Sequence, residues 1–169
     1  DRSGRLIGAI ASLRDITENR KAQQALQDSE EKYRNIIESI EDGYFEVDLA
    51  GNFTFFNPWL IKVLGYSADE LEDQSYRLIM DGKNQRKVYE AFNRVYKTGQ
   101  RVKELDWQVL KKDGTNLSVE TTALPIKDHM RVVGFKGLVH DITERKQAEE
   151  ALRQSENLYR TIFETTGTA

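Results

Sequence analysis

The same short sequence occurs twice in this chain, once near each end. Residues 15–18 read Asp-Ile-Thr-Glu, and 126 positions later residues 141–144 read Asp-Ile-Thr-Glu again. The match continues without gaps into the residues that follow, and it runs backwards as well, so that Arg5 corresponds to Arg131. A repeat period of this length indicates tandem domains. The alternative, chance similarity between two charged helices, does not explain the unbroken register.

The repeat divides the chain into four parts. We predict the last strand of a preceding unit in residues 1–16, a linker helix in 17–40, a complete central domain in 41–143 and a helix leading into a following unit in 144–169. A length of 169 residues suits one domain with helical additions. The first strand, Arg5–Leu13, would lack its own sheet, and it would either be disordered or pair with an exposed strand edge.

Each copy of the repeated motif is followed by a helical pattern with a narrow apolar stripe. The stripe residues recur at alternating spacings of four and three, which is the pattern of a coiled-coil seam. Because a short seam containing Ala and Ser is marginal alone, we favour pairing with a second copy over packing on the same domain. The seam residues are Ala22, Leu26, Ser29, Tyr33 and Ile36 in the first helix, and Ala148, Leu152, Ser155, Tyr159 and Ile162 in the second.

The central segment alternates strand and helix signals. Apolar and polar residues with a period of two predict strands over residues 43–49, 53–57, 102–110, 115–126 and 131–140. Helices are predicted over 59–64, for one turn after Ser67, and over 84–97. This order predicts an α+β fold, in which a five-stranded antiparallel sheet carries its helices on one face.

Several short motifs occur in the central segment in a fixed order. They are Asn57, Gly65-Tyr66-Ser67, Asp69-Glu70-Leu71, Lys112-Asp113-Gly114 and Asp141-Ile142-Thr143. In this order and spacing, from Glu30 to Arg145, they resemble the signature of PAS sensory domains. The repeated ends are similar to the junctions in tandem PAS arrays of bacterial signalling proteins. The chain departs from the family pattern at Glu72, Asp73 and Gln74, where an apolar residue and a glycine are common.

The resemblance implies a sensory or signal-relay module in the cytoplasm. Such a module would detect a small molecule or a redox state and transmit it through paired linker helices to a histidine kinase or diguanylate cyclase outside this chain. The alternative is a ligand-free scaffold that dimerises and relays signals between neighbouring domains. In both cases the transfer motif would be Asp141, Ile142 and Thr143, with its earlier copy Asp15, Ile16 and Thr17. The implied partners are a second copy of the chain and the neighbouring PAS and output domains.

The resemblance also implies a cavity between the sheet and the helices. Mostly apolar walls with a few polar groups can hold a small molecule, although the same residues would serve as an ordinary core. The candidate lining residues are Phe45, Val47, Phe55, Asn57, Leu60, Leu64, Leu71, Val88, Phe92, Leu105, Trp107, Thr121, Phe135 and Gly137.

The residue inventory narrows the cofactors that such a cavity could hold. Haem-binding relatives use a histidine on the long helix, but His129 and His140 are the two histidines here and both fall outside it. The chain has no cysteine, which excludes a flavin–cysteine adduct, thiolate metal sites and disulfides. Non-covalent flavin binding stays open, with Trp107 and Asn57 as candidate contacts.

Composition and motif content also limit the functional classes. With 25 basic and 28 acidic residues, the chain has no polybasic region for nucleic acid, and no apolar run is long enough to span a membrane. No glycine-rich phosphate loop or catalytic set of side chains occurs, so we expect that this segment is not an enzyme. We also expect no metal site, and we interpret His140 as a structural residue near the strand-to-helix junction.

Overall fold

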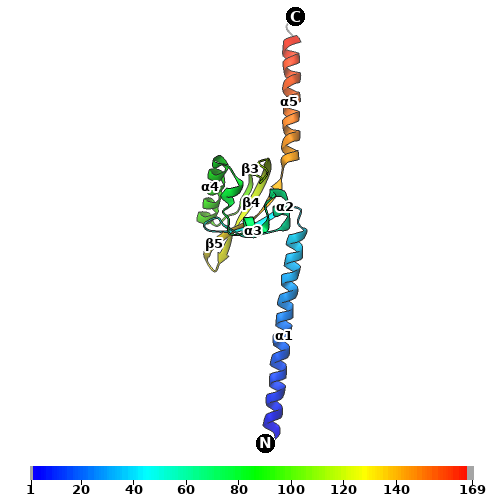
Figure 1. Cartoon of the computed structure of the whole chain (residues 1–169), viewed down its shortest axis with the longest axis vertical. Coiled ribbons are helices and arrows are strands. Elements are labelled where there is room, and N and C mark those ends of the chain that lie inside the picture. Colours follow the sequence, from blue (N-terminus) through cyan, green and yellow to red (C-terminus); the bar gives the residue numbers. More distant parts are fainter. Residues whose placement is uncertain (1, 167–169) are drawn as a thin grey trace. The chain divides into compact units, whose positions relative to one another are not determined.

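The computed structural model describes the backbone of residues 2–166 and the side chains of residues 18–164. The chain forms two compact units, residues 1–39 and residues 40–169. The first unit is a single helix, α1 (Arg2–Ser39), and the second contains the sheet, the remaining helices and α5 (Thr143–Thr166) (Figure 1). Within the part of the chain that the structure describes, no helix combines the length and apolar character that a membrane span requires.

Helix α1 differs from the sequence prediction for the start of the chain. A strand was predicted over Arg5–Leu13 and a helix start near Thr17, but the backbone is helical from Arg2 to Ser39. A strand needs a neighbouring strand to bond its N–H and C=O groups, whereas a helix bonds them within one segment. The predicted strand is therefore wrong for this chain. The origin of residues 1–16 in a preceding domain stays a prediction.

The five predicted strands form one antiparallel sheet. They are β1 (Gly43–Asp48), β2 (Phe53–Phe56), β3 (Val102–Leu110), β4 (Asn116–Asp128) and β5 (Arg131–Asp141), arranged in the order β2-β1-β5-β4-β3. The last strand in the sequence is thus the central strand of the sheet, where Gly137 is paired with Phe45 on one side and with Ala123 on the other. The α+β prediction is confirmed.

Local caps define the helices between β2 and β3. Helix α2 (Pro58–Leu64) begins after Asn57 and ends at Gly65, which has a φ of 77°. The one-turn helix α3 (Ala68–Leu71) has a complete capping box between Ser67 and Glu70. A 3-10 turn, η1 (Tyr76–Ile79), was not predicted. The long helix α4 (Gly82–Thr98) starts two residues before its predicted start, because the Asp81 side chain accepts from the backbone N–H of Asn84.

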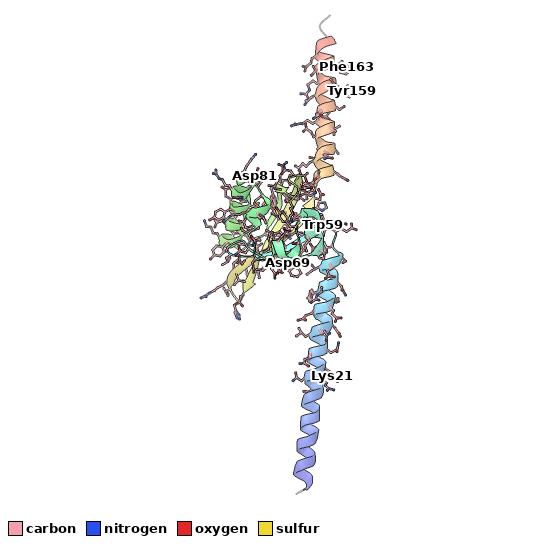
Figure 2. The ribbon with its side chains drawn as sticks, in the orientation of Figure 1. Lys21, Trp59, Asp69, Asp81, Tyr159 and Phe163 are labelled. Atoms are coloured by element: carbon pink, nitrogen blue, oxygen red, sulfur yellow. The ribbon has the colours of Figure 1, made fainter. Side chains whose placement is uncertain are left out.

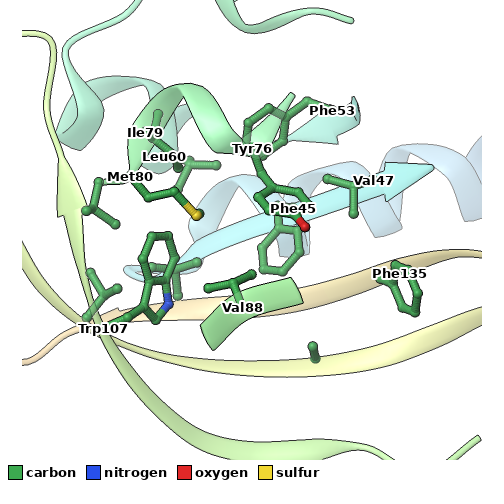
Figure 3. Close-up of a cluster of buried hydrophobic side chains, with 14 of the residues drawn as sticks. Phe45, Val47, Phe53, Leu60, Tyr76, Ile79, Met80, Val88, Trp107 and Phe135 are labelled. Carbon is green, nitrogen blue, oxygen red and sulfur yellow. The ribbon is translucent and has the colours of Figure 1, made fainter. Parts of the chain in front are cut away.

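The core lies between the sheet and these helices. Helix α4 contacts β3 and β4, while α2 contacts β1. Figure 3 shows Phe45, Met80 and Trp107 in the shared interior, to which β1, β3 and the segment before α4 all contribute. Three phenylalanine rings fill a large part of it: Phe92 lies 4.9 Å from Phe135 and 6.3 Å from Phe45, both in stacked geometry.

Candidate functional site

A small cavity lies in the interior of the domain. It has a volume of about 30 Å³. That space suffices for a water molecule or two, whereas pockets for organic ligands have volumes of roughly 300–1,000 Å³. Its lining residues are Phe45, Phe53, Leu60, Tyr76, Ile79, Met80, Val88, Phe92, Trp107, Val109, Thr121 and Val139. The large side chains around it therefore form a nearly filled core.

Six of the predicted lining residues border this cavity: Phe45, Leu60, Val88, Phe92, Trp107 and Thr121. Eight do not border it: Val47, Phe55, Asn57, Leu64, Leu71, Leu105, Phe135 and Gly137. The largest error concerns Phe55, which is 41% exposed and makes an edge-to-face contact with Tyr44 outside the core. The pairing of β1 with β2 has a register irregularity between Glu46 and Val47, which interrupts the alternation of side chains along β2. Phe53 is therefore buried in the core, whereas Phe55 is exposed.

Other cavity residues were missed in the sequence. Val109 lies two positions after Trp107, and Val139 lies two positions after Gly137, so the period-two rule could have identified both. Tyr76, Ile79 and Met80 belong to the segment around η1, where the family pattern is lost. Their burial depends on how this irregular segment folds back onto the core, which no periodic signal indicates.

A buried hydrogen bond joins two cavity residues. The indole N–H of Trp107 donates to the hydroxyl of Thr121 over 2.8 Å, and Thr121 is 3% exposed. We expect Thr121→Val to lower the free energy of unfolding by about 1–2 kcal/mol, because the buried N–H loses its acceptor without a change of side-chain shape.

Urea denaturation monitored by tryptophan fluorescence measures this effect. The matched control is Thr122→Val, the same substitution at the next residue of β4, where the side chain is only partly buried. We expect the control to change stability little. Equal stabilities for the two variants would show that the Trp107–Thr121 bond contributes nothing.

Asn57 does not line the cavity, and its side chain bonds to the backbone. It is fully buried, and its side-chain oxygen accepts from the backbone N–H groups of Tyr44 and Leu60 at 3.0 and 3.2 Å. Its amide nitrogen donates to the carbonyl of Asp42 over 2.9 Å. Asn57 therefore holds the start of β1 against the start of α2, and it does not present a polar group to the cavity.

The junction between β5 and α5 is the second candidate site. Ile142 is 2% exposed, and its backbone N–H donates to the carbonyl of Ser118 in β4 over 2.9 Å. The hydroxyl of Thr143 accepts from the backbone N–H of Ser118 over 3.1 Å, and the carboxylate of Asp141 accepts from the N–H of Thr143 over 2.8 Å. All three predicted transfer residues thus meet at one point, where they attach the start of α5 to the sheet.

Two ion pairs extend this attachment along the first turn of α5. Arg145 bonds Glu120 of β4 at 3.1 Å, and Lys146 bonds Asp106 of β3 at 2.7 Å. Hydrogen bonding to these carboxylates raises the pKa of Arg145 and of Lys146 above their ordinary values. Both cations therefore stay charged at neutral pH, and each links α5 to a different strand.

The predicted seam residues on both helices are accessible. On α5, Leu152, Tyr159 and Ile162 are 50–63% exposed, and Figure 2 shows Tyr159 and Phe163 projecting from the helix. On α1, Leu26, Tyr33 and Ile36 are 49–67% exposed. The smaller seam residues Ala22, Ser29, Ala148 and Ser155 are exposed as well. The side chains of the earlier motif copy, Asp15 to Thr17, lie outside the described side chains.

His140, the residue before the junction motif, is paired with a carboxylate. His140 Nδ1 lies 2.6 Å from a carboxylate oxygen of Asp42, which is a pairing between the end of β5 and the residue before β1. Among the described residues, no group of three or more His, Cys, Asp or Glu side chains could hold a metal ion.

Comparison with known proteins places this arrangement in a family. A family model described as a PAS domain matches residues 41–144. The chain is 28% identical over 154 residues to Sporulation kinase E of Bacillus subtilis, covering 89% of the chain and 20% of that protein. It is also 28% identical over 136 residues to the signal transduction histidine-protein kinase AtoS of Escherichia coli, covering 80% and 22%. The chain thus spans about a fifth of the length of these curated relatives.

Solved structures share the fold. A PAS domain from Colwellia psychrerythraea matches with a TM-score of 0.62 at 19% identity, covering 68% of this chain and 97% of that one. A domain of a sensory box sensor histidine kinase/response regulator from Geobacter sulfurreducens matches with a TM-score of 0.59 at 24% identity, covering 69% and 96%. Because the family match extends over more than half of the sequence, the chain belongs to the PAS domain family.

Proposed function

We propose that this chain is a signal-relay PAS module that transmits changes in its sheet to a paired helix α5 and onward to a histidine kinase domain. The observation that carries the proposal is the bonding of the start of α5 to β4 through Ile142 and Thr143. The sensor kinases among the relatives support the choice of output domain. This function corresponds to the ligand-free relay rather than to a sensor of small molecules in the core.

The size of the core cavity supports a ligand-free interior. A volume of about 30 Å³ is far below that of a pocket for a flavin or a haem. The walls consist of large apolar side chains, and the polar pair Trp107–Thr121 is satisfied internally. Opening room for a cofactor would require several core side chains to leave their packed positions, which is costly in a close-packed interior.

The junction supplies a mechanical connection between sheet and helix. The central strand β5 ends at Asp141, and α5 starts at Thr143, so a single residue separates them. Since Thr143, Arg145 and Lys146 all bind β3 or β4, a shift of these strands would reorient the first turn of α5. A relay of this kind requires two packing states of the sheet whose populations the input changes.

The exposed stripe on α5 supplies the partner surface. Leu152, Tyr159 and Ile162 keep the spacing of a coiled-coil seam, and each is 50–63% exposed. Two copies of the chain could bury these side chains against each other. A change in the orientation of α5 would then alter the packing between the two α5 helices. We therefore propose a homodimer in which α5 pairs with α5 of the second copy.

We expect Thr143→Val to accelerate hydrogen exchange in the first turn of α5, around Lys146 and Gln147, by about 5- to 10-fold. The valine keeps the shape of threonine but cannot accept from Ser118, and the loss of one such bond costs about 1 kcal/mol. Amide exchange measured by NMR tests this. Thr161→Val, which makes the same change farther along α5, should leave that first turn unaffected.

A distance measurement tests the relay itself. Because the sequence contains no cysteine, Asn157→Cys introduces a single thiol for a spin label on α5, outside the seam. We expect one narrow label-to-label distance in the dimer and a shifted or broadened distribution when Thr143→Val is added. An unchanged distribution would refute transmission through Thr143, and the absence of any dimer signal at micromolar concentrations would refute the α5 pairing.

A further inference from the structure

A second, larger cavity opens on the outer surface of the domain. It has a volume of about 220 Å³ and lies among the β1–β2 turn, η1, α4 and β5. We call it the outer cleft, and its lining includes Gly51, Tyr76, Arg77, Tyr89, Asn93 and Tyr96. Tyr76 and Phe92 line both this cleft and the core cavity, so their rings separate the two spaces.

The wall formed by Tyr76 depends on close approach of the β1–β2 turn. Gly51 has a φ of +90°, and a Cβ atom at this position would lie 2.5–2.8 Å from the ring of Tyr76. The turn therefore contacts the ring through a residue without a side chain. Tyr76 is also held in edge-to-face contact with Phe92, with ring centroids 5.3 Å apart. Together these contacts give the cleft a fixed aromatic wall.

The charge of the cleft is positive. Arg77 is the one formally charged residue among the described residues that line it, and none of these carries a carboxylate. The ion pairs formed by side chains 18–164 do not include Arg77, whose guanidinium lies 5.9 Å from the ring centre of Tyr76. Helix α4 adds five Lys and Arg residues against one Glu, which further favours an anion.

Neutral hydrogen-bonding groups complete the lining. Tyr89 and Tyr96 leave more than half of their side-chain area exposed on α4, and Asn93 lies between them in the sequence. Burial raises the pKa of Tyr76, although the nearby Arg77 opposes this, so its phenol remains protonated at neutral pH. The cleft thus combines aromatic rings with hydroxyl, amide and guanidinium donors.

We propose that the outer cleft binds a small aromatic carboxylate, with its ring against Tyr76 and its carboxylate on Arg77. A planar guanidinium can donate two parallel hydrogen bonds to a carboxylate, and the aromatic walls match a flat ring. The volume lies below that of a pocket for drug-sized ligands, so a molecule with a single ring fits best. This inference goes beyond the proposed relay, which needs no ligand.

A ligand in the cleft would also contact β5, the strand that leads to the junction with α5. Phe135, which lines the cleft, belongs to β5 and stacks on Phe92 at 4.9 Å. Strand β5 continues to Asp141, where the attachment of α5 begins. Occupancy of the cleft would therefore act on the central strand from outside the core.

Titration of the ¹⁵N-labelled chain with 4-hydroxybenzoate tests the proposal. We expect millimolar or tighter binding, with chemical-shift changes at Gly51, Arg77 and Asn93. Benzamide, which has the ring without the charge, should bind at least tenfold more weakly. Arg77→Gln should raise the Kd of 4-hydroxybenzoate at least tenfold. The matched control is Arg94→Gln, which removes the same charge from α4 at a position outside the cleft lining and should change the Kd by no more than about twofold.

Each other outcome would overturn the proposal. Equal binding of benzamide, or equal effects of Arg77→Gln and Arg94→Gln, would exclude recognition of the carboxylate by Arg77. No shift changes at about 10 mM ligand, or changes confined to core residues such as Val109, would exclude the cleft. Because Arg77 is exposed, we expect Arg77→Gln to fold normally. The amide spectrum of each variant, recorded without ligand, verifies that the variant is folded. Thr143→Val should bind normally, so failure of the cleft and failure of the relay are distinguishable.

Discussion

Gly137→Ala should destabilise the domain by about 3 kcal/mol or more, which is a large fraction of the roughly 5–15 kcal/mol that stabilises a typical domain. Gly137 lies in the central strand β5, between Phe45 of β1 and Ala123 of β4. A Cβ atom there would overlap the carbonyl oxygen of Thr122 and approach two ring atoms of Phe45 at 3.0 Å. The carbonyl belongs to a paired strand and cannot move without breaking the ladder.

Thermal denaturation monitored by circular dichroism measures this effect. The matched control is Gly82→Ala at the first position of α4, where an added Cβ meets no atom within 4 Å. That change should be neutral or stabilise by up to about 1 kcal/mol, because alanine restricts the unfolded chain. If both variants denature at the same temperature as the parent chain, the close packing around Gly137 does not limit stability.

Asn57→Leu should cost about 3 kcal/mol of unfolding free energy. The leucine has a similar size, but it leaves the backbone N–H groups of Tyr44 and Leu60 without the side-chain acceptor that they share. The carbonyl of Asp42 loses a donor as well. Each buried polar group left unpaired costs about 1–3 kcal/mol, although the bond from Leu60 N–H to the Asn57 carbonyl offsets part of this.

Urea titration of the variant measures the loss, and two comparisons interpret it. Asn116→Ala alters an exposed asparagine at the start of β4 and should change stability by less than about 0.5 kcal/mol. Asn57→Asp keeps the acceptor but places a carboxylate at a fully buried position. Its stability should fall as the pH rises above about 4, the pKa of an aspartate in the unfolded chain, because burial favours the protonated acid in the folded state. A pH-independent Asn57→Asp variant would contradict the buried network.

Local sequence signals predicted most of the elements. The period-two alternation located all five strands, and β3 was predicted to its last residue. Ser67 indicated where a helix begins, and the glycines at residues 65 and 99 indicated where helices end. These signals work because side-chain alternation and helix caps depend on neighbours within a few residues.

The position of the junction between β5 and α5 was also predictable, whereas its role in signal transfer stays a prediction. Asp141, Ile142 and Thr143 stood out because the motif occurs twice in the chain. The contacts that attach α5 were not predictable. Thr143 and Arg145 bond Ser118 and Glu120, each 25 residues earlier in the sequence, and Lys146 bonds Asp106, which lies earlier still. Only the pairing of β4 with β5 and β3 brings these groups to the start of α5.

The sequence by itself thus determined the α+β class, the order of the strands along the chain, the family resemblance and the position of the junction. The tertiary structure decided that the core is nearly filled, that Phe55 lies outside it, that Asn57 is a cap and that Arg5–Leu13 is helical. It also created the outer cleft from the β1–β2 turn, η1, α4 and β5, which are separate in the sequence. The physical reason is that periodicity and capping are local, whereas cavity volume and polar partners depend on side chains that meet only after the sheet has formed.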